Sequence, residues 1–170
     1  MKPREAKLTH EELTRLLDYD PETGVFVWKI VTSNRVKVGD VAGSPDRHGH
    51  LLIKLNGIRY ASHRLAWFIV NKAWPEQEID HINRVKDDNR IANLREATRN
   101  QNNRNVGIKR HNKSGFKGVC RHSQAKHKYQ AQILVNGKKI YLGLFDTPED
   151  AHAAYVAASE EHHGEYGVTH

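Results

Sequence analysis

The sequence contains a single cysteine, Cys120, and a single methionine among its 170 residues. One cysteine excludes an intramolecular disulfide framework and any zinc finger built on thiolates, and it is compatible with a reducing cytosol. Hydrophobic residues make up 38% of the chain and charged residues 28%. This balance argues against wholesale disorder and leaves room for one ordinary domain or two small ones.

Long apolar runs are also missing. The longest, residues 65–70, is far shorter than the roughly 20 residues that a membrane-spanning helix needs. The first five residues are mostly charged or polar and lead into a polar segment, so we expect no secretory signal. These absences lead us to expect a cytoplasmic protein with no membrane partner.

Acidic residues are absent from one long segment. Residues 97–145 contain no Asp or Glu and eleven Lys or Arg. The whole chain has 27 Lys and Arg against 20 Asp and Glu, a formal net charge of +7 that leaves twelve His uncounted. Such a balance favours a polyanionic partner, with nucleic acid first and an anionic membrane surface second.

The first hundred residues carry helix and hairpin signals. Thr9 and Glu12 form a capping box ahead of an apolar helical face, and Asn56-Gly57 is a two-residue hairpin turn. Residues 31–49 are expected to be a loop with at most one short strand. We expect helices over 11–19 and 62–72, and strands over 25–28, 50–55 and 58–61.

The last third of the chain has a different pattern. Asn136-Gly137 is again a hairpin turn, and Thr147-Pro148 followed by two acids is a helix start that leads to a stop at Gly164. We expect strands over 118–121, 129–135 and 138–142, and a helix from Thr147 to His162. The predicted fold class is α+β, with two modules over 1–103 and 113–170 joined by a basic linker over 104–112.

The candidate chemistry lies between residues 79 and 103, where an Asp-His pair precedes many Asn. Phosphodiester hydrolysis needs a base near neutral pH, for which His is suited, and a hard divalent cation held by carboxylate and amide oxygens. Asp80 and His81 supply one group of each kind. An Asp-His pair is also common in solvated turns, and Asn-rich segments form turns and helix caps. These residues alone therefore leave both interpretations open.

The same residues resemble the motif of HNH nucleases, in the variant found in phage and intron homing endonucleases. The motif here consists of Asp80-His81, Asn93-Leu94-Arg95 and Asn102. Segments 19–24 and 60–67 also look like those proteins, and the resemblance covers residues 8–103. It implies a ββα-metal module, with a strand ending at His81, a second strand from about Asn93 and a short helix carrying Asn102.

The resemblance also implies roles. His81 would be the general base that activates water, and Asp80 with Asn102 would hold one divalent cation, Mg²⁺ or Mn²⁺. Asn93 would fix the orientation of His81 through a backbone or side-chain hydrogen bond. Many members have His where this chain has Asn102, a departure that the homing enzymes share, and an amide oxygen still suits Mg²⁺.

Several neighbouring residues keep two interpretations. Asn100 or Asn103 could replace Asn102 as the ligand, and Asn89 is expected to be a turn residue more than a ligand. His63 is expected to be structural more than a phosphate contact. Arg64 fits a phosphate contact and a charge on the helix surface equally well.

A second resemblance covers residues 113–167. Segments 114–119, 138–151 and 163–166 look like the AP2 DNA-binding domain of plant transcription factors, which is also found fused to phage HNH nucleases. That family reads double-stranded DNA with its sheet in the major groove, which admits a β-ribbon or sheet. Cys120 stands where the plant domains have Arg, and Gln124 or a neighbour stands where they have Trp, so their base code does not transfer.

The expected DNA contacts follow from position in that family. The strand residues that would touch DNA are Lys117, His122, Gln132, Lys139 and Tyr141. Those of the first hairpin turn that would reach phosphates are Arg121, Lys126 and Lys128. The remaining cations of the predicted DNA-binding set are Arg64, Arg104, Lys109, Arg110 and Lys113.

We therefore expect a free-standing, phage-encoded DNA endonuclease of the homing type, acting in the cytoplasm of a bacterial host. A monomer would nick DNA, and a double-strand break would need a homodimer or two successive events. Its partners would be double-stranded DNA and one divalent cation, with no small-molecule cofactor. The alternative is a non-catalytic, sequence-specific DNA-binding regulator with a decayed HNH fold, against which the intact Asp80, His81 and Asn93 argue.

Overall fold

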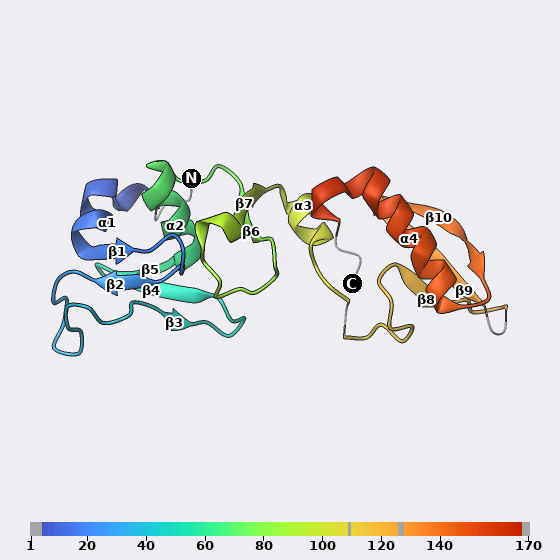
Figure 1. Cartoon of the computed structure of the whole chain (residues 1–170), viewed down its shortest axis with the longest axis horizontal. Helices are drawn as coiled ribbons and strands as arrows, with labels where there is room; N and C mark the ends of the chain where they lie inside the picture. Colours follow the sequence, from blue (N-terminus) through green and yellow to red (C-terminus); the bar gives the residue numbers. More distant parts are fainter. Residues whose placement is uncertain (1–4, 109, 126–127, 168–170) are drawn as a thin grey trace. The chain divides into compact units, whose positions relative to one another are not determined.

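The computed structural model describes residues 5–108, 110–125 and 128–167, and its elements are a mixture of helices and strands (Figure 1). The chain divides into two compact units, Met1–Thr98 and Arg99–His170, and each unit has its own hydrophobic core. No helix in the described part of the chain is long and apolar enough to cross a membrane. The predicted modules over 1–103 and 113–170 and the linker over 104–112 stay a prediction.

The N-terminal helix is shorter than the sequence predicts. The Thr9 side chain accepts a hydrogen bond from the Glu12 N–H at 3.1 Å, which confirms the capping signal. The helix predicted over 11–19 is wrong at its end, because Leu17 has an extended backbone, pairs with Trp28 and is buried as a strand residue. The first elements are η1 (Glu5–Lys7), α1 (His10–Leu16), β1 (Leu17–Tyr19) and β2 (Phe26–Trp28).

A three-stranded antiparallel sheet with the order β3-β4-β5 leads directly into the second helix. Asn56 and Gly57 have φ angles of 49° and 81°, which is the backbone that a two-residue hairpin of this twist requires. The predicted hairpin and the helix predicted over 62–72 are both confirmed. The elements are β3 (Ser44–Pro45), β4 (Leu51–Leu55), β5 (Ile58–Ala61) and α2 (Ser62–Asn71).

The core of the first unit lies where α1, α2 and this sheet meet. Leu13 of α1 and Leu65 of α2 are 0% exposed, and Ile53 of β4 is 1% exposed. An antiparallel pair then carries the motif residues, with Asp80 opposite Arg95 and His81 opposite Leu94. The pair confirms the expected strand ending at His81. Its elements are β6 (Glu78–His81), η2 (Ile91–Asn93) and β7 (Leu94–Ala97).

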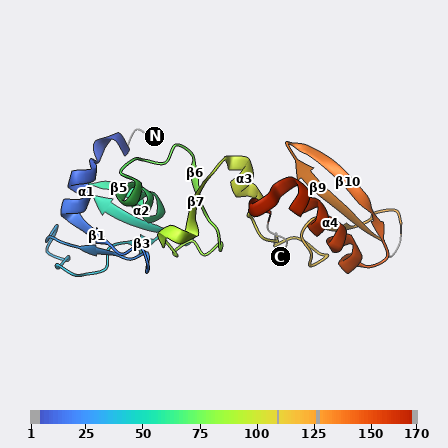
Figure 2. The same cartoon turned by 45° about the horizontal axis from the view of Figure 1, so that its top comes forward.

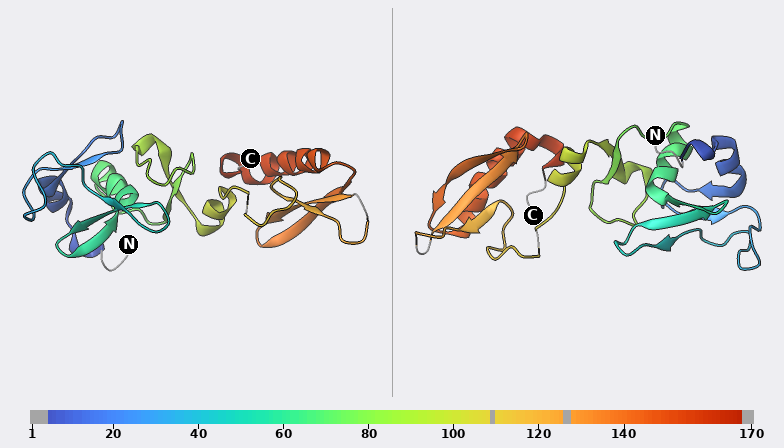
Figure 3. Two further views of the ribbon diagram at one scale, coloured as in Figure 1. Left: turned by 90° about the horizontal axis from the view of Figure 1, so that it is seen from below. Right: turned by 180° about the vertical axis from the view of Figure 1, so that it is seen from behind.

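The second unit is a sheet with the order β10-β9-β8, and α4 lies along one of its faces (Figures 2 and 3). The Thr147 hydroxyl accepts the Asp150 N–H at 3.1 Å, which confirms the predicted helix start. The last strand runs to Phe145, past the predicted end at 142, with an irregularity between Tyr141 and Gly143. The elements are α3 (Arg99–Arg104), β8 (Val119–Arg121), β9 (Tyr129–Val135), β10 (Lys138–Phe145), α4 (Pro148–His163) and η3 (Gly164–Tyr166).

Gly118 allows β8 to lie directly against α4. Its φ is +77°, and a Cβ on this residue would be 2.0 Å from Cδ2 of the Tyr155 ring. Any other residue would therefore push the strand away from the helix. The close approach buries Val119, Ala131 and Ala151 together.

Candidate functional site

His81 ends β6 and is 5% exposed. The strand pairing continues just beyond it, because the Ile82 N–H donates to the Asn93 carbonyl at 2.9 Å. This bond fixes the backbone on the C-terminal side of His81. The imidazole is thus carried by a rigid strand end and is held in a largely buried position.

The imidazole of His81 contacts Asn89. His81 Nε2 and Asn89 Oδ1 are 3.3 Å apart, and Asn89 Nδ2 donates to the Asp87 carbonyl at 3.1 Å. Because Nδ2 is committed to a carbonyl, the amide presents its oxygen to the ring, and an amide oxygen only accepts. His81 Nε2 is therefore the donor in this contact.

Asn89 itself is held by the turn that precedes β2. The Tyr19 hydroxyl donates to the Asn89 carbonyl at 2.7 Å, and Asn89 is 1% exposed. Gly24 has a φ of +73°, and a Cβ there would be 2.4 Å from the Arg90 nitrogen. Only glycine permits this contact between the turn and the loop. The sequence predicts a turn role for Asn89 and carries no signal of its contact with His81.

The surroundings of His81 favour a neutral ring. Burial lowers the pKa of His81, while the hydrogen bond to Asn89 and the nearby carboxylates of Asp80, Asp88 and Asp87 act in the opposite direction. With burial dominant, the ring is neutral near pH 7 and able to accept a proton. The carboxylates stabilise the imidazolium that forms when it does so.

Asp80 is 4% exposed and forms an ion pair across the two strands. Arg95 Nε and Arg95 Nη2 each lie 3.0 Å from Asp80 Oδ2. His81 follows Asp80 at the end of β6, and the Asp80 carboxylate acts electrostatically on the ring. The sequence predicts no role for Arg95. A cation bound at Asp80 would share the carboxylate with the guanidinium or displace it.

Asn93 acts on the loop between the two strands. Its Oδ1 accepts the Asn83 N–H at 3.0 Å, and its Nδ2 donates to the Asp88 carbonyl at 2.8 Å. Its backbone carbonyl accepts the hydrogen bond from the Ile82 N–H. Asn93 thus positions the chain next to His81, and Asn89 contacts the ring itself. Asn102, the other predicted ligand, lies on α3 in the second unit.

Two further histidines lie against His81. The ring centroids are 5.6 Å apart for His50 and His81, 5.1 Å for His63 and His81, and 5.3 Å for His50 and His63. His50 immediately precedes β4, and His63 is in the first turn of α2. The sequence predicts a structural role for His63 and no role for His50. With twelve His in the chain, no local signal marks His50.

Arg64 differs from both of its expected roles. It is 5% exposed, and its Nε and Nη2 donate to the two carboxylate oxygens of Glu5 at 2.6 and 3.0 Å. The same guanidinium donates to the carbonyls of Gln77 and Pro75 at 2.9 and 3.1 Å. A guanidinium buried in this way cannot reach a phosphate, so Arg64 is a structural residue.

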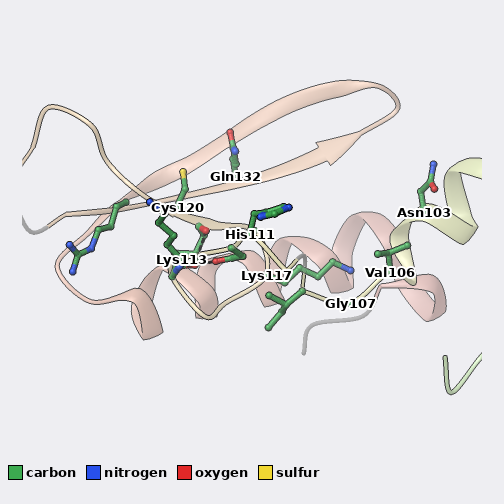
Figure 4. Close-up of a pocket in the computed structure, with 14 residues that line it drawn as sticks. Asn103, Val106, Gly107, His111, Lys113, Lys117, Cys120 and Gln132 are labelled. Atoms are coloured by element: carbon green, nitrogen blue, oxygen red, sulfur yellow. Dashed lines mark hydrogen bonds between the residues drawn. The ribbon is translucent and has the colours of Figure 1, made fainter. Parts of the chain in front are cut away.

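The sheet of the second unit has an outward face, which we define as the face opposite α4. Ala131 and Ile133 point toward α4 and are at most 2% exposed, so the alternate residues of β9 face outward. Gln132 pairs with Tyr141, which is 57% exposed. In Figure 4 the side chain of Gln132 projects from the sheet on the side away from α4. The outward face places the predicted DNA contacts Gln132, Lys139 and Tyr141 together.

The other predicted DNA contacts differ in their interactions and in their exposure. Lys117 Nζ donates to the Arg104 carbonyl at 2.6 Å, and Lys128 forms an ion pair with Asp146. His122 Nδ1 accepts the Ala125 N–H at 2.9 Å and so stabilises the turn after β8. The exposed cations in this group are Arg110, Lys113, Arg121 and Lys139. Lys109 and Lys126 lie outside the described residues.

A cavity of about 640 Å³ lies within the second unit (Figure 4). Part of its lining comes from the predicted linker, including Val106, Gly107 and His111. Lys117 and Gln132 line it as well. Residues of the predicted basic linker and of the sheet therefore face one shared space.

The model of the HNH endonuclease family matches residues 60–104. The matched segment includes α2, both strands of the Asp80–Arg95 pair and α3. No curated protein and no solved structure matches the chain. The match supports an HNH nuclease, a class that typically uses a divalent metal and acts on DNA.

Proposed function

We propose that this protein is a metal-dependent HNH endonuclease of the homing type, which hydrolyses phosphodiester bonds of double-stranded DNA. The observation that carries the proposal is the buried His81 at the end of β6, whose ring is held by Asn89 at 3.3 Å and kept neutral by burial. The family match over the same residues supports it.

In this reaction the His81 ring takes a proton from water, and the water oxygen attacks phosphorus as the bond to the leaving oxygen breaks. A neutral ring is needed at the start, and burial provides it. The ring becomes an imidazolium, and Asp80, Asp87 and Asp88 lower the free energy of that cation. Asn89 holds the ring in a fixed orientation through its contact with Nε2.

The donor set at β6 fits a divalent cation. Asp80 offers a buried anionic oxygen ligand next to the base in sequence, which a hard cation prefers. We retain Asp80 as one ligand and Asn102 as the other, both from the resemblance, with Mg²⁺ or Mn²⁺ as the ion. When bound, the cation neutralises charge on the scissile phosphate and the leaving oxygen.

The second unit would hold the DNA, as its likeness to AP2 domains implies. The outward face presents Gln132, Lys139 and Tyr141 without a covering helix, and the acid-free segment 97–145 to which they belong contains eleven Lys or Arg. Glutamine can read adenine in the major groove, and lysine can read guanine. Phosphate contacts would provide most of the affinity.

The test is incubation of the full chain with supercoiled phage or plasmid DNA, with Mg²⁺ or with EDTA. We expect nicked circles with Mg²⁺ and none with EDTA. DNA binding without cleavage in either Mg²⁺ or Mn²⁺ would instead support the alternative of a non-catalytic regulator, which binds DNA through the same second unit.

Replacing Asn89 by alanine should slow cleavage about tenfold or more while DNA affinity stays unchanged, because ring orientation is lost but the base remains. The hydrogen bond to Asn89 raises the pKa of His81, so its loss should lower that pKa. The cleavage rate should then begin to rise at a lower pH. A pH–rate profile of nicking measures both effects. The matched control is Asn83→Ala in the same loop, whose side chain donates to Asp88 at 2.6 Å. Equal losses in both variants would point to loop damage instead of ring positioning.

Replacing Arg121 by alanine should weaken binding to all sequences and make the log–log salt slope shallower by about 0.9, because one phosphate contact is lost. Replacing Gln132 by alanine should instead relax preference at particular base pairs by about 1–3 kcal/mol. Gel-shift titrations over a salt series, with a randomised DNA pool for preference, separate the two. An unchanged slope for the first variant and unchanged preference for the second would remove this sheet from the DNA interface.

A further inference from the structure

Three histidines from distant parts of the first unit converge on one point. His50 precedes β4, His63 lies in the first turn of α2, and His81 ends β6. Each can offer one ring nitrogen such that all three nitrogens lie within 4.8 Å of one another. We call these residues the histidine cluster.

The rings of the cluster are suited to bind a cation as neutral donors. An imidazole binds a metal ion through a ring nitrogen that carries no proton. Within the described residues, the buried Nδ1 of His50 has no hydrogen-bond partner. A buried polar atom left in this state costs free energy, and coordination to a metal ion would remove that cost.

The donor type selects the ion. Imidazole nitrogens suit Zn²⁺, Co²⁺, Ni²⁺ and Cu²⁺, whereas Mg²⁺ requires oxygen ligands. Two nitrogens on a tetrahedral Zn²⁺ are about 3.4 Å apart at the usual bond length. The three nitrogens lie within 4.8 Å of one another, so they would have to close by at most about 1.4 Å to share one ion. Three protein ligands leave one position open.

We propose that the histidine cluster binds one transition-metal dication of the Zn²⁺ type, and that this ion inhibits the nuclease. Inhibition follows because a neutral imidazole has one ring nitrogen without a proton, so His81 cannot ligate the ion and accept a proton from water at the same time. The inhibition rests on the proposed function, whereas the metal site does not. The site differs from the Mg²⁺ site, which uses the oxygen of Asp80.

Binding is tested on the metal-free full chain by titration with Co²⁺, whose tetrahedral complexes absorb visible light strongly, followed by displacement with Zn²⁺. We expect one Co²⁺ per chain, displaced by Zn²⁺ and not by excess Mg²⁺. His50→Ala should weaken Zn²⁺ binding by more than about 10–100-fold, the loss that removal of a mere supporting partner causes. The matched control is His48→Ala, an exposed histidine two positions away, which should bind like the parent.

Two results would overturn the site: Co²⁺ absorption unchanged by His50→Ala, or equal losses in the His48 and His50 variants. Inhibition is tested by adding Zn²⁺ to nicking reactions that contain excess Mg²⁺. We expect the parent and His48→Ala to be inhibited, and His50→Ala to nick DNA in Mg²⁺ and to resist Zn²⁺. Full activity with the cluster saturated by Zn²⁺ would refute the inhibitory role. A chain without any nicking would refute the proposed function, and the Co²⁺ spectrum would still decide the metal site.

Discussion

Replacing His81 by alanine is expected to reduce cleavage by about 10²–10⁴-fold, because a positioned general base contributes about that much to the rate. DNA affinity should hardly change, since the buried ring offers little surface to DNA and the proposed anchor is the second unit. Single-turnover nicking and gel-shift affinity, measured on the same preparations, separate the two quantities. Wild-type turnover in this variant would refute the assignment of the base.

A chemical rescue makes the experiment specific. The His81→Ala variant leaves a space beside Asn89 in which added imidazole can bind, so imidazole should partly restore cleavage if the role is proton transfer. The control is Asp80→Ala, which we expect imidazole not to rescue, because its loss is that of a carboxylate. Loss of activity in His81→Ala without rescue, together with loss of the native tryptophan fluorescence, would indicate an unfolded site instead.

The pH dependence of the parent follows from the same residue. A base acts only when it is neutral, so the rate rises with pH through the pKa of His81 and is lost below it. Burial lowers that pKa below its ordinary value of 6.5, so cleavage should persist at pH values where an exposed histidine is already charged. A rise of rate centred above 6.5 would contradict a base in this environment.

Local signals in the sequence were sufficient for much of the fold. Asn-Gly pairs have the backbone freedom that two-residue hairpins need, and the Thr147-Pro148 start satisfies the first turn of α4, so these elements depend little on the rest of the chain. The end of α1 does depend on it. Leu17 continues an apolar helical pattern, but its place in the sheet opposite Trp28 outweighs helix propensity.

The candidate site was predictable only where the motif is local. Asp80 and His81 are adjacent in sequence and mark the end of β6, whereas their partners come from elsewhere in the first unit. Asn89 reaches His81 because Tyr19, at the end of β1, holds the loop between β6 and β7. His50 reaches the cluster because it lies at the start of β4 in the sheet. Such contacts depend on tertiary packing, which no spacing of residues along the chain records.

Arg64 illustrates the same limit for a charge. An arginine one turn into a helix, beside a predicted nuclease site, suits a phosphate contact in a basic protein. The pairing partner is Glu5, 59 positions away, and its carboxylate is 1% exposed. Because buried charges require a partner, this ion pair decides where the N-terminal segment lies against α2.

Replacing Arg64 by alanine should destabilise the first unit by about 3–5 kcal/mol, because it leaves the Glu5 carboxylate buried without its partner. The carbonyls of Pro75 and Gln77, in the segment that leads into β6, would lose a hydrogen-bond donor as well. All three tryptophans of the chain, at positions 28, 67 and 74, lie in this unit. Urea unfolding of the full chain followed by tryptophan fluorescence therefore reports on the first unit alone.

Two further variants separate the ion pair from simple loss of packing. Arg64→Lys keeps the charge but loses the bidentate geometry, so its free energy of unfolding should lie between those of the parent and Arg64→Ala. The double variant Arg64→Met with Glu5→Gln removes both charges. It should lose less free energy of unfolding than Arg64→Ala alone, because no buried charge is left unpaired. Folded Arg64→Ala should bind DNA with the parent's salt slope, since the guanidinium does not reach phosphate. A stable variant with a shallower salt slope would instead return Arg64 to the DNA interface.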